Sequence, residues 1–151
     1  MIVGGGIGTP PMLHLAKIYG KKATVISGLR SAEAVILQED FKKTGAETIL
    51  CTDDGTTGRK GFVTEPLKEL LEQGSIDAVY ACGPMPMLKA VKKIAESRGI
   101  KCQVSLEQRM GCGIGACLVC SCETNKEGTD RYAKVCTNGP VFYSEEVTLN
   151  D

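Results

Sequence analysis

Four cysteines lie close together near the end of this 151-residue chain, and they constrain its fold more than any other feature. They are Cys112, Cys117, Cys120 and Cys122. The N-terminus has neither the basic residues nor the long apolar stretch of a secretory signal. We therefore expect a cytoplasmic protein, and disulfides are rare in that compartment. Clustered thiols in such a chain indicate metal ligands or redox groups.

The spacing of the cysteines favours one kind of metal centre. Cys112-x4-Cys117-x2-Cys120, followed by Cys136 after fifteen residues, matches the pattern that holds a plant-type [2Fe–2S] cluster. Glycines between the cysteines let such a loop curl around the cluster. A structural zinc site is the alternative, but zinc ligands typically come as two close pairs. Cys122 is the rival for the fourth position; we prefer Cys136 because it staples the far end of an expected hairpin.

Charge and histidine content exclude several classes of function. Lysine plus arginine and aspartate plus glutamate both number 18, which argues against non-specific nucleic-acid binding. Apolar runs are too short for a membrane span. His14 is the single histidine, so a Cys2His2 zinc site is impossible.

Strand-like and helix-like segments alternate over the first hundred residues. The expected strands cover residues 2–3, 23–27, 48–51, 78–82 and 101–105. The expected helices begin near Met12 and cover 32–44, 65–73 and 86–98, with Ser31 and Thr64 as caps. This rhythm predicts an α/β fold with a five-stranded parallel, doubly wound sheet in the order 3-2-1-4-5. We assign residues 1–106 to a nicotinamide dinucleotide-binding domain.

Residues 107–151 differ in character and are expected to form a small [2Fe–2S] module. Strands over 121–124 and 132–135 flank a turn at 125–130 and predict a hairpin. The first strand of the chain is unusually short for a sheet centre, which suggests a C-terminal part of something longer.

A glycine-rich loop follows the first strand and opens a helix. Glycines let the backbone approach a pyrophosphate, and the helix N-terminus offers free N–H groups. The pattern Gly-x-Gly-x-x-Pro is not the full dinucleotide fingerprint, and a tight turn alone also explains it. The candidate nucleotide-binding residues here are Gly4, Gly5, Gly6, Gly8, Thr9 and Pro11.

A second turn strengthens the nucleotide hypothesis. Cys82, Gly83, Pro84 and Met85 follow the fourth strand, and the carboxyl ends of strands one and four border the crevice where such sheets bind ligands. Arg30, after the second strand, suits a pyrophosphate or the extra phosphate of NADP, so the choice between NAD and NADP stays open. The segment 52–61 is either a crevice wall or a surface loop.

The two expected sites transfer different numbers of electrons in one step. A nicotinamide exchanges electrons in pairs, as hydride, and an iron–sulfur cluster takes one at a time, so a flavin must mediate. Too few residues remain here for a flavin-binding barrel. The flavin, expected as FAD, must then come from an upstream domain or a partner.

These motifs together resemble a known family. Gly6-x-Gly8-x-x-Pro11, the Cys82-Gly83-Pro84 turn and the run from Ser105 to Cys120 are similar to the electron-transfer subunit of NAD-dependent dihydroorotate dehydrogenase, in the ferredoxin-reductase superfamily. The resemblance implies cluster ligands at Cys112, Cys117, Cys120 and Cys136, NAD in the crevice, and FAD in a barrel that this chain lacks. It also implies a catalytic partner subunit whose FMN oxidises dihydroorotate to orotate in pyrimidine biosynthesis.

Two other functions remain as alternatives. A related reductase subunit would pass electrons between NAD(P)H and ferredoxin or a sulfur substrate. A zinc-stapled module would be no enzyme. In the favoured interpretation the chain is part of an oxidoreductase and is inactive alone.

Overall fold

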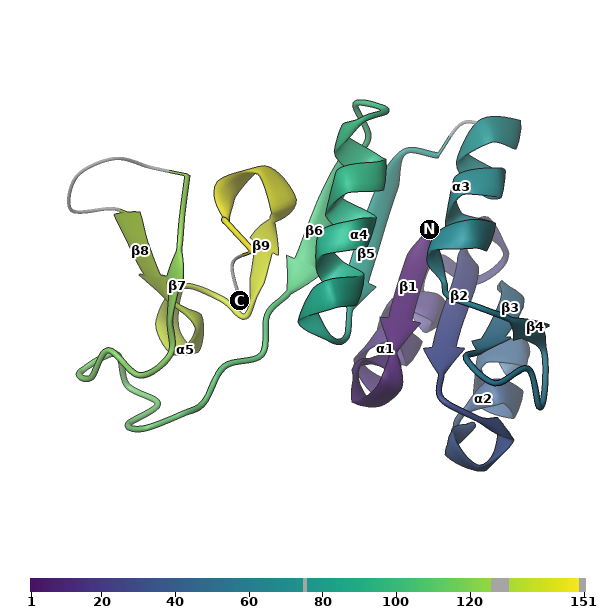
Figure 1. The fold of residues 1–151 in the computed structure, drawn as a ribbon, viewed down its shortest axis with the longest axis horizontal. Coiled ribbons are helices and arrows are strands. Elements are labelled where there is room, and N and C mark those ends of the chain that lie inside the picture. Colours follow the sequence, from purple (N-terminus) through teal and green to yellow (C-terminus); the bar gives the residue numbers. More distant parts are fainter. Residues whose placement is uncertain (75, 126–130, 150–151) are drawn as a thin grey trace.

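The computed structural model describes residues 1–74, 76–125 and 131–149 (Figure 1). Its main sheet has, in the described part of the chain, the strand order β4-β3-β2-β1-β5-β6-β9. All neighbours in this sheet pair in parallel except β6 and β9. The strands are β1 (Ile2–Gly5), β2 (Thr24–Leu29), β3 (Glu47–Thr52), β4 (Arg59–Lys60), β5 (Ala78–Cys82), β6 (Lys101–Ser105) and β9 (Val141–Tyr143).

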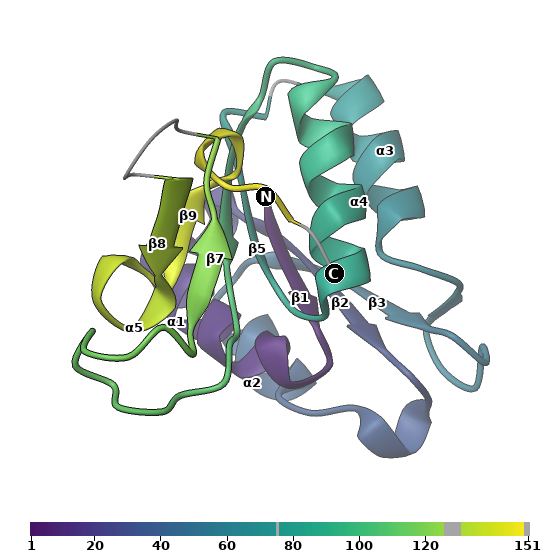
Figure 2. The ribbon, with the colours of Figure 1, turned by 60° about the vertical axis from the view of Figure 1, so that its left-hand side comes forward.

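Helices cover both faces of this sheet, as a doubly wound fold requires. The helices are α1 (Thr9–Tyr19), α2 (Gln38–Lys43), α3 (Thr64–Gln73), α4 (Met85–Glu96) and α5 (Val135–Asn138). In Figure 2, α3 and α4 lie on one side of the sheet, and α1 and α2 lie on the other. One apolar core forms under α3 and α4, around Leu67, Leu88 and Val91. A second forms under α1 and α2, around Met12 and Phe41.

The expected α/β class and the parallel order 3-2-1-4-5 are confirmed, because β3-β2-β1-β5-β6 follow that order. The expectation of only five strands is wrong: β4 adds a short parallel edge, and β9 closes the other edge antiparallel to β6. The expected division at residue 106 stays a prediction. However, β9 belongs by sequence to the second module and by pairing to the first.

The expected helix over 32–44 is wrong in its first half. Only Ala32–Ala34 form a 3₁₀ turn there, and α2 begins at Gln38. Leu37 has a φ of 60°, a left-handed conformation that interrupts a helix. The Ser31 side chain makes no capping hydrogen bond. Thr64 is not a cap, because it is already the first residue of α3 and Val63 occupies the cap position.

A two-stranded hairpin carries the cysteine-rich loop. Its strands β7 (Ser121–Glu123) and β8 (Tyr132–Lys134) pair antiparallel. Most of the expected turn, residues 126–130, lies outside the described residues. The second strand was expected to include Val135, but β8 ends at Lys134 and α5 begins at Val135.

The C-terminal segment joins this hairpin to the main sheet. Phe142 in β9 pairs with Val104 and is buried in the core under α4. Thr124 forms a bridge to Val147. Lys92 in α4 donates hydrogen bonds to the carbonyl oxygens of Ser144 and Val147 and to the Glu96 carboxylate. Hydrogen bonds thus join residues 144–148 both to α4 and to residues 123–125 at the end of β7.

Candidate functional site: a nucleotide cleft and a cysteine cradle

A cleft of about 490 Å³ opens at the carboxyl edge of the sheet, between the ends of β1 and β2 and the first turns of α3 and α4. Glycines and apolar side chains form most of its wall, with one cation and one acid. The lining residues are Gly5, Gly6, Gly28, Leu29, Arg30, Asp53, Gly61, Phe62, Val63, Thr64, Pro84, Pro86, Met87 and Ala90. This is the edge at which doubly wound sheets bind nucleotides.

Four of the residues chosen from the sequence line this cleft. Gly5 and Gly6 come from the end of β1, Arg30 from the end of β2 and Pro84 from the turn before α4. The other candidates, Gly4, Gly8, Thr9, Pro11, Cys82, Gly83 and Met85, are not among the lining residues. Their role in nucleotide binding remains a prediction.

Part of the wall opposite the glycine loop comes from the segment 52–61, for which a crevice wall was one of the two expectations, and the rest of this wall was missed. Asp53 follows β3, and its N–H donates to the Leu29 carbonyl at 3.1 Å, which ties it to the end of β2. Phe62 precedes α3 and exposes 66% of its surface while lining the cleft. Asp53 and Gly61 belong to that segment, whereas Phe62, Val63 and Thr64 were missed. The path of residues 59–63 back to the cleft depends on the pairing of β4, which leaves no local signal.

The glycine loop and the turn after β5 are packed against each other. A Cβ on Gly8 would collide with the backbone of Cys82 and Gly83. A Cβ on Gly5 would lie 3.0 Å from Pro84 Cδ and 2.5 Å from Met87 Sδ. Close approach of the backbone therefore requires glycine at position 8, whereas at position 5 the nearest atoms belong to the side chains of Met87 and Pro84.

Cys82 and Thr9 lie on the side of the sheet that α1 covers. Cys82 is half-buried beside the core under α1. Burial raises the pKa of its thiol, partly opposed by a hydrogen bond with Ser105. Thr9 begins α1 and is fully buried, and its hydroxyl has no hydrogen-bond partner among the described residues.

The cysteines of the second site gather in two pairs, and the first is Cys112 with Cys117. The N–H of Cys117 donates to Cys112 Sγ at 3.3 Å. This bond, followed by one from the Ile114 N–H, lowers the pKa of Cys112 to about 6. Cys112 is exposed and Cys117 is half-buried. The loop backbone therefore stabilises a thiolate, the form that binds metal.

The second pair is Cys120 with Cys136. The N–H of Cys136 is directed at Cys120 and lowers the pKa of the Cys120 thiol, and the two side chains are hydrogen-bonded. The neighbouring Cys120 sulfur in turn raises the pKa of Cys136. Cys122, the rival, lies in β7 and is buried, and this burial raises the pKa of its thiol.

The arrangement in pairs suits a two-iron cluster. Among the described residues, no three cysteine, histidine or acidic side chains are close enough together to hold a single metal ion. A zinc ion needs four ligands around one point, whereas four thiolates of a [2Fe–2S] cluster are shared between two irons. Two thiol pairs with backbone N–H groups directed at their sulfurs fit the cluster.

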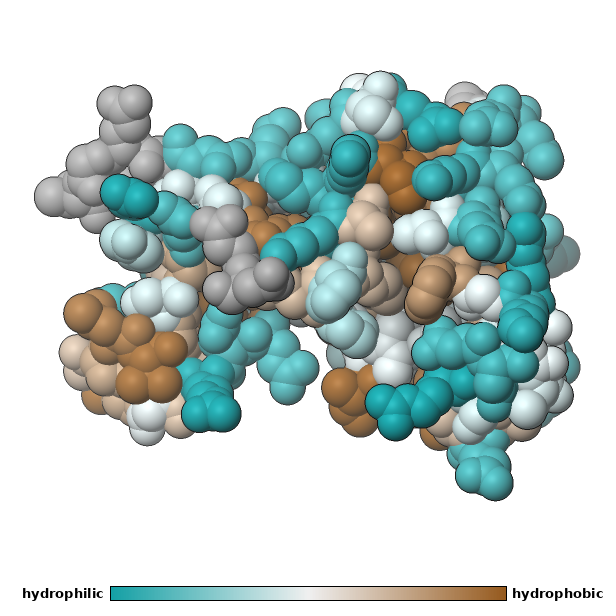
Figure 3. Space-filling view, viewed as in Figure 1, coloured by the Kyte–Doolittle hydropathy of each residue, from teal (hydrophilic) through white to brown (hydrophobic). Residues whose placement is uncertain are grey.

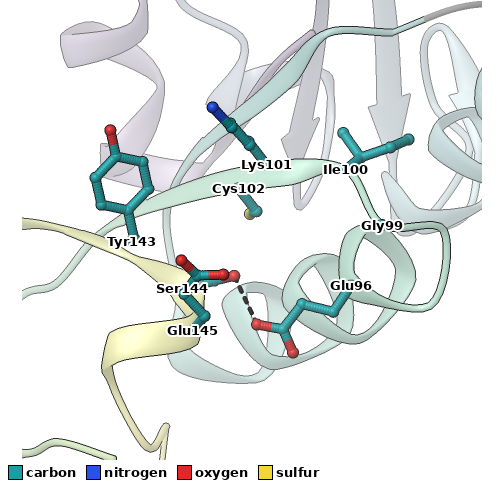
Figure 4. Close-up of a pocket in the computed structure, with 8 residues that line it drawn as sticks. All are labelled: Glu96, Gly99, Ile100, Lys101, Cys102, Tyr143, Ser144 and Glu145. Carbon is teal, nitrogen blue, oxygen red and sulfur yellow. Dashed lines mark hydrogen bonds between the residues drawn. The ribbon is translucent and has the colours of Figure 1, made fainter.

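A second cavity, of about 430 Å³, lies at the opposite edge of the sheet, near the start of β6 (Figure 4). Glu96, Cys102, Tyr143 and Ser144 are among the residues that line it. The Ser144 hydroxyl donates to Glu96 at 2.7 Å. Cys102 is buried there, and burial raises the pKa of its thiol to about 11.

Comparison with protein families defines the class. Residues 2–93 match the family described as the oxidoreductase NAD-binding domain, and the chain belongs to this family. Residues 107–148 match the iron–sulfur cluster binding domain of dihydroorotate dehydrogenase B. Both halves of the expected organisation thus have known counterparts.

Individual relatives make the resemblance specific. A protein of Caldanaerobacter subterraneus subsp. tengcongensis, named "Dihydroorotate dehydrogenase B (NAD(+)), electron transfer subunit", is 45% identical over 97% of this chain and 58% of its own length. A protein of the same name from Fusobacterium nucleatum subsp. nucleatum is 44% identical over 99% of this chain and 57% of its own. The resemblance stated from the motifs is confirmed. The chain spans little more than half the length of these relatives.

A solved structure shares the whole fold. It is described as an NADH-dependent reduced ferredoxin-NADP oxidoreductase studied for flavin-based electron bifurcation. The TM-score is 0.82 at 29% identity, over 98% of this chain and 53% of that one. Within the described residues, no helix is long and apolar enough to cross a membrane.

Proposed function

We propose that this chain is the nucleotide- and cluster-binding part of the electron-transfer subunit of an NAD-dependent dihydroorotate dehydrogenase. It would pass electrons between NAD and the flavin of a catalytic partner. The observation that carries the proposal is one chain that joins a cleft at the carboxyl edge of its sheet to a cradle of paired thiols. Identity of 44–45% to proteins with that name supports it.

At the nucleotide end, the backbone of Gly5 and Gly6 and the guanidinium of Arg30 would hold the pyrophosphate of NAD. Gly6 has a φ of 54°, and a Cβ there would meet nothing within 4 Å, so this turn leaves open space for a ligand. The shape of the loop would depend on four residues that do not line the cleft: Gly4, Gly8, Thr9 and Pro11. Cys82, Gly83, Pro84 and Met85 would border the nicotinamide.

At the cluster end, Cys112, Cys117, Cys120 and Cys136 would hold the [2Fe–2S] cluster, with Cys122 left out. When bound, such a cluster supplies one-electron transfer. The chain's own contribution is a set of N–H groups that stabilise the thiolates before metal arrives. Because NAD exchanges electron pairs, we propose that an FAD outside this chain mediates between the two sites.

An exposed apolar surface supports a protein partner beside the cluster. Ile114, Leu118 and Val119 expose 77%, 75% and 54% of their surfaces. Figure 3 shows hydrophobic atoms gathered at the lower left, over the loop that leads to β7. Such patches mark interaction sites, and we propose that an FMN-containing catalytic subunit covers this one. All eight cysteines are free, which favours the reducing cytoplasm.

A related function has one observation in its favour. The matched solved structure belongs to a reductase that acts between NADH, ferredoxin and NADP, as its description states. A subunit passing electrons between NAD(P)H and ferredoxin is therefore the second candidate. Isolation of the native complex distinguishes the two, because only the first co-purifies with a protein that oxidises dihydroorotate.

The relay is tested on the purified, flavin-free chain. Anaerobically isolated protein should be red-brown and contain iron and sulfide, whereas a zinc protein would be colourless. NADH should bleach the cluster absorbance in stopped-flow experiments only when the flavin domain is supplied. Rapid bleaching in rigorously flavin-free protein, or zinc in place of iron, would overturn the proposal.

A further inference from the structure

A lysine is bonded to a loop that has no charge of its own. The segment 110–122, here named the cluster loop, contains four cysteines and no acidic or basic side chain. Lys134, at the end of β8, donates a hydrogen bond from Nζ to the Gly115 carbonyl in this loop, at 2.5 Å. Lys134 is partly buried, and its backbone N–H is held by Asn138 Oδ1 at 2.9 Å.

No carboxylate in the described ranges forms an ion pair with Lys134. The positive charge is therefore not neutralised by an ion pair within that part of the chain. A charge in a partly buried position is also screened less by water and salt than one on an open surface.

The peptide groups on either side of Gly115 connect this lysine to both pairs of cysteines. The N–H of Gly115 is directed at Cys136. The carbonyl that accepts from Lys134 belongs to the same peptide group as the Ala116 N–H, which is directed at Cys112. A cation on the oxygen of a peptide polarises its N–H and strengthens the bond that this N–H donates.

We propose that Lys134 is a positioning residue that raises the reduction potential of the cluster, through its charge and through the Gly115–Ala116 peptide. This inference rests on the proposed function, because it requires a [2Fe–2S] cluster on these cysteines. A cluster held by four thiolates is negative and becomes more so by one electron. A nearby cation and stronger hydrogen bonds to the sulfurs both favour the reduced state.

The test measures the midpoint potential of the cluster-loaded protein by redox titration, followed by the EPR signal of the reduced cluster. Lys134→Met should lower the potential, with the reduced fraction falling about tenfold at fixed potential, which equals about 59 mV for one electron. Lys134→Gln keeps a hydrogen-bond donor without the charge and should also lower it. Lys134→Arg should restore it, and Lys68→Met on the distant, exposed face of α3 should leave it unchanged.

The outcomes separate this inference from the function on which it rests. No [2Fe–2S] signal in the wild-type protein would remove both. A normal signal with an unchanged potential in Lys134→Met, or an equal shift in Lys134→Arg, would overturn the role of Lys134 alone. If the neutral variants do not keep their cluster, acetylation of the loaded wild-type protein removes the Lys134 charge after the cluster is in place and should lower the potential more than the same treatment of loaded Lys134→Arg, whose guanidinium is not acetylated. Equal shifts in the two proteins contradict the proposal.

Discussion

At the scale of single residues, glycine stands at different positions of this protein for different physical reasons. Gly8 has no room for a side chain, because the backbone of Cys82 and Gly83 occupies the place of its Cβ. Gly6 has open space but a left-handed backbone. A sequence pattern shows both as the same letter, although one position serves packing and the other leaves space for a ligand.

Gly8→Ala should destabilise the fold whether or not a nucleotide is bound. Forcing a methyl group against backbone atoms costs about 1–3 kcal/mol. Chemical denaturation measures this loss. Gly74→Ala is the matched control, since its Cβ would meet nothing within 4 Å and its backbone is extended. Equal midpoints for the two variants would show that the loop can move away from β5.

Gly6→Ala should instead weaken NADH binding, because the methyl group enters the cleft. The left-handed conformation adds about 1–2 kcal/mol of strain. Gly99→Ala has the same strain (φ 66°) and equally open surroundings away from the cleft, so it isolates the binding effect. Calorimetry on the flavin-containing complex should show weaker binding for Gly6→Ala only. Equal affinities for the two variants would place the pyrophosphate elsewhere.

Cluster content should depend on which cysteine is replaced. Cys136→Ser should lose the [2Fe–2S] absorbance, because its thiol is paired with Cys120. Cys122→Ser should keep it, because that thiol is buried in β7 and is not part of either pair. Iron and sulfide analysis of both variants gives the answer, and the reverse result would reassign the fourth ligand.

At the scale of elements, the sequence predicted what depends on local periodicity. The parallel strands and α4 were within reach because their apolar positions alternate or repeat within one segment. The break before α2 was not, since nothing in the sequence marks Leu37 for a left-handed conformation. Nor was β9, because an antiparallel partner for β6 some forty residues away leaves no local signal. The hydrogen bond from Lys134 to Gly115 could not be predicted from the sequence for the same reason, since it joins residues that are far apart along the chain.

Lys92 is the element-scale contact most open to test. Its ammonium group joins α4 to the C-terminal segment through three acceptors. Lys92→Met should cost about 1–2 kcal/mol and speed hydrogen exchange in residues 144–149. Lys93→Met, one position along and exposed, is the control. Unchanged exchange in the first variant would mean that β9 alone holds the segment.

At the scale of the whole molecule, the cluster module and the nucleotide domain share one core. Cys120, Val135, Phe142 and Val147 belong to the same buried cluster as Leu88 of α4. A module of this size seldom folds by itself, and here it obtains stability from the sheet. The two sites are therefore expected to keep a fixed separation, which suits the electron transfer through an intervening flavin that we propose.

Phe142→Ala should consequently destabilise both modules together, by about 3–5 kcal/mol. Cluster absorbance and far-ultraviolet circular dichroism should be lost in a single transition at lower denaturant than in the wild type. Phe62→Ala, which removes an exposed ring, should leave the midpoint nearly unchanged. Two separate transitions in Phe142→Ala would show that the modules unfold independently.

The antiparallel pairing of β9 with β6 also sets an order of events during synthesis. Until residues 141–143 emerge from the ribosome, the hydrogen-bonding groups along one side of β6 have no partner strand. Translation at about 5–20 residues per second leaves this side uncovered for several seconds while the cysteine-rich stretch is being made. Unpaired strand edges invite association between nascent chains. Lys101 is exposed at the start of β6. Its charge opposes pairing of this temporarily uncovered strand with another chain.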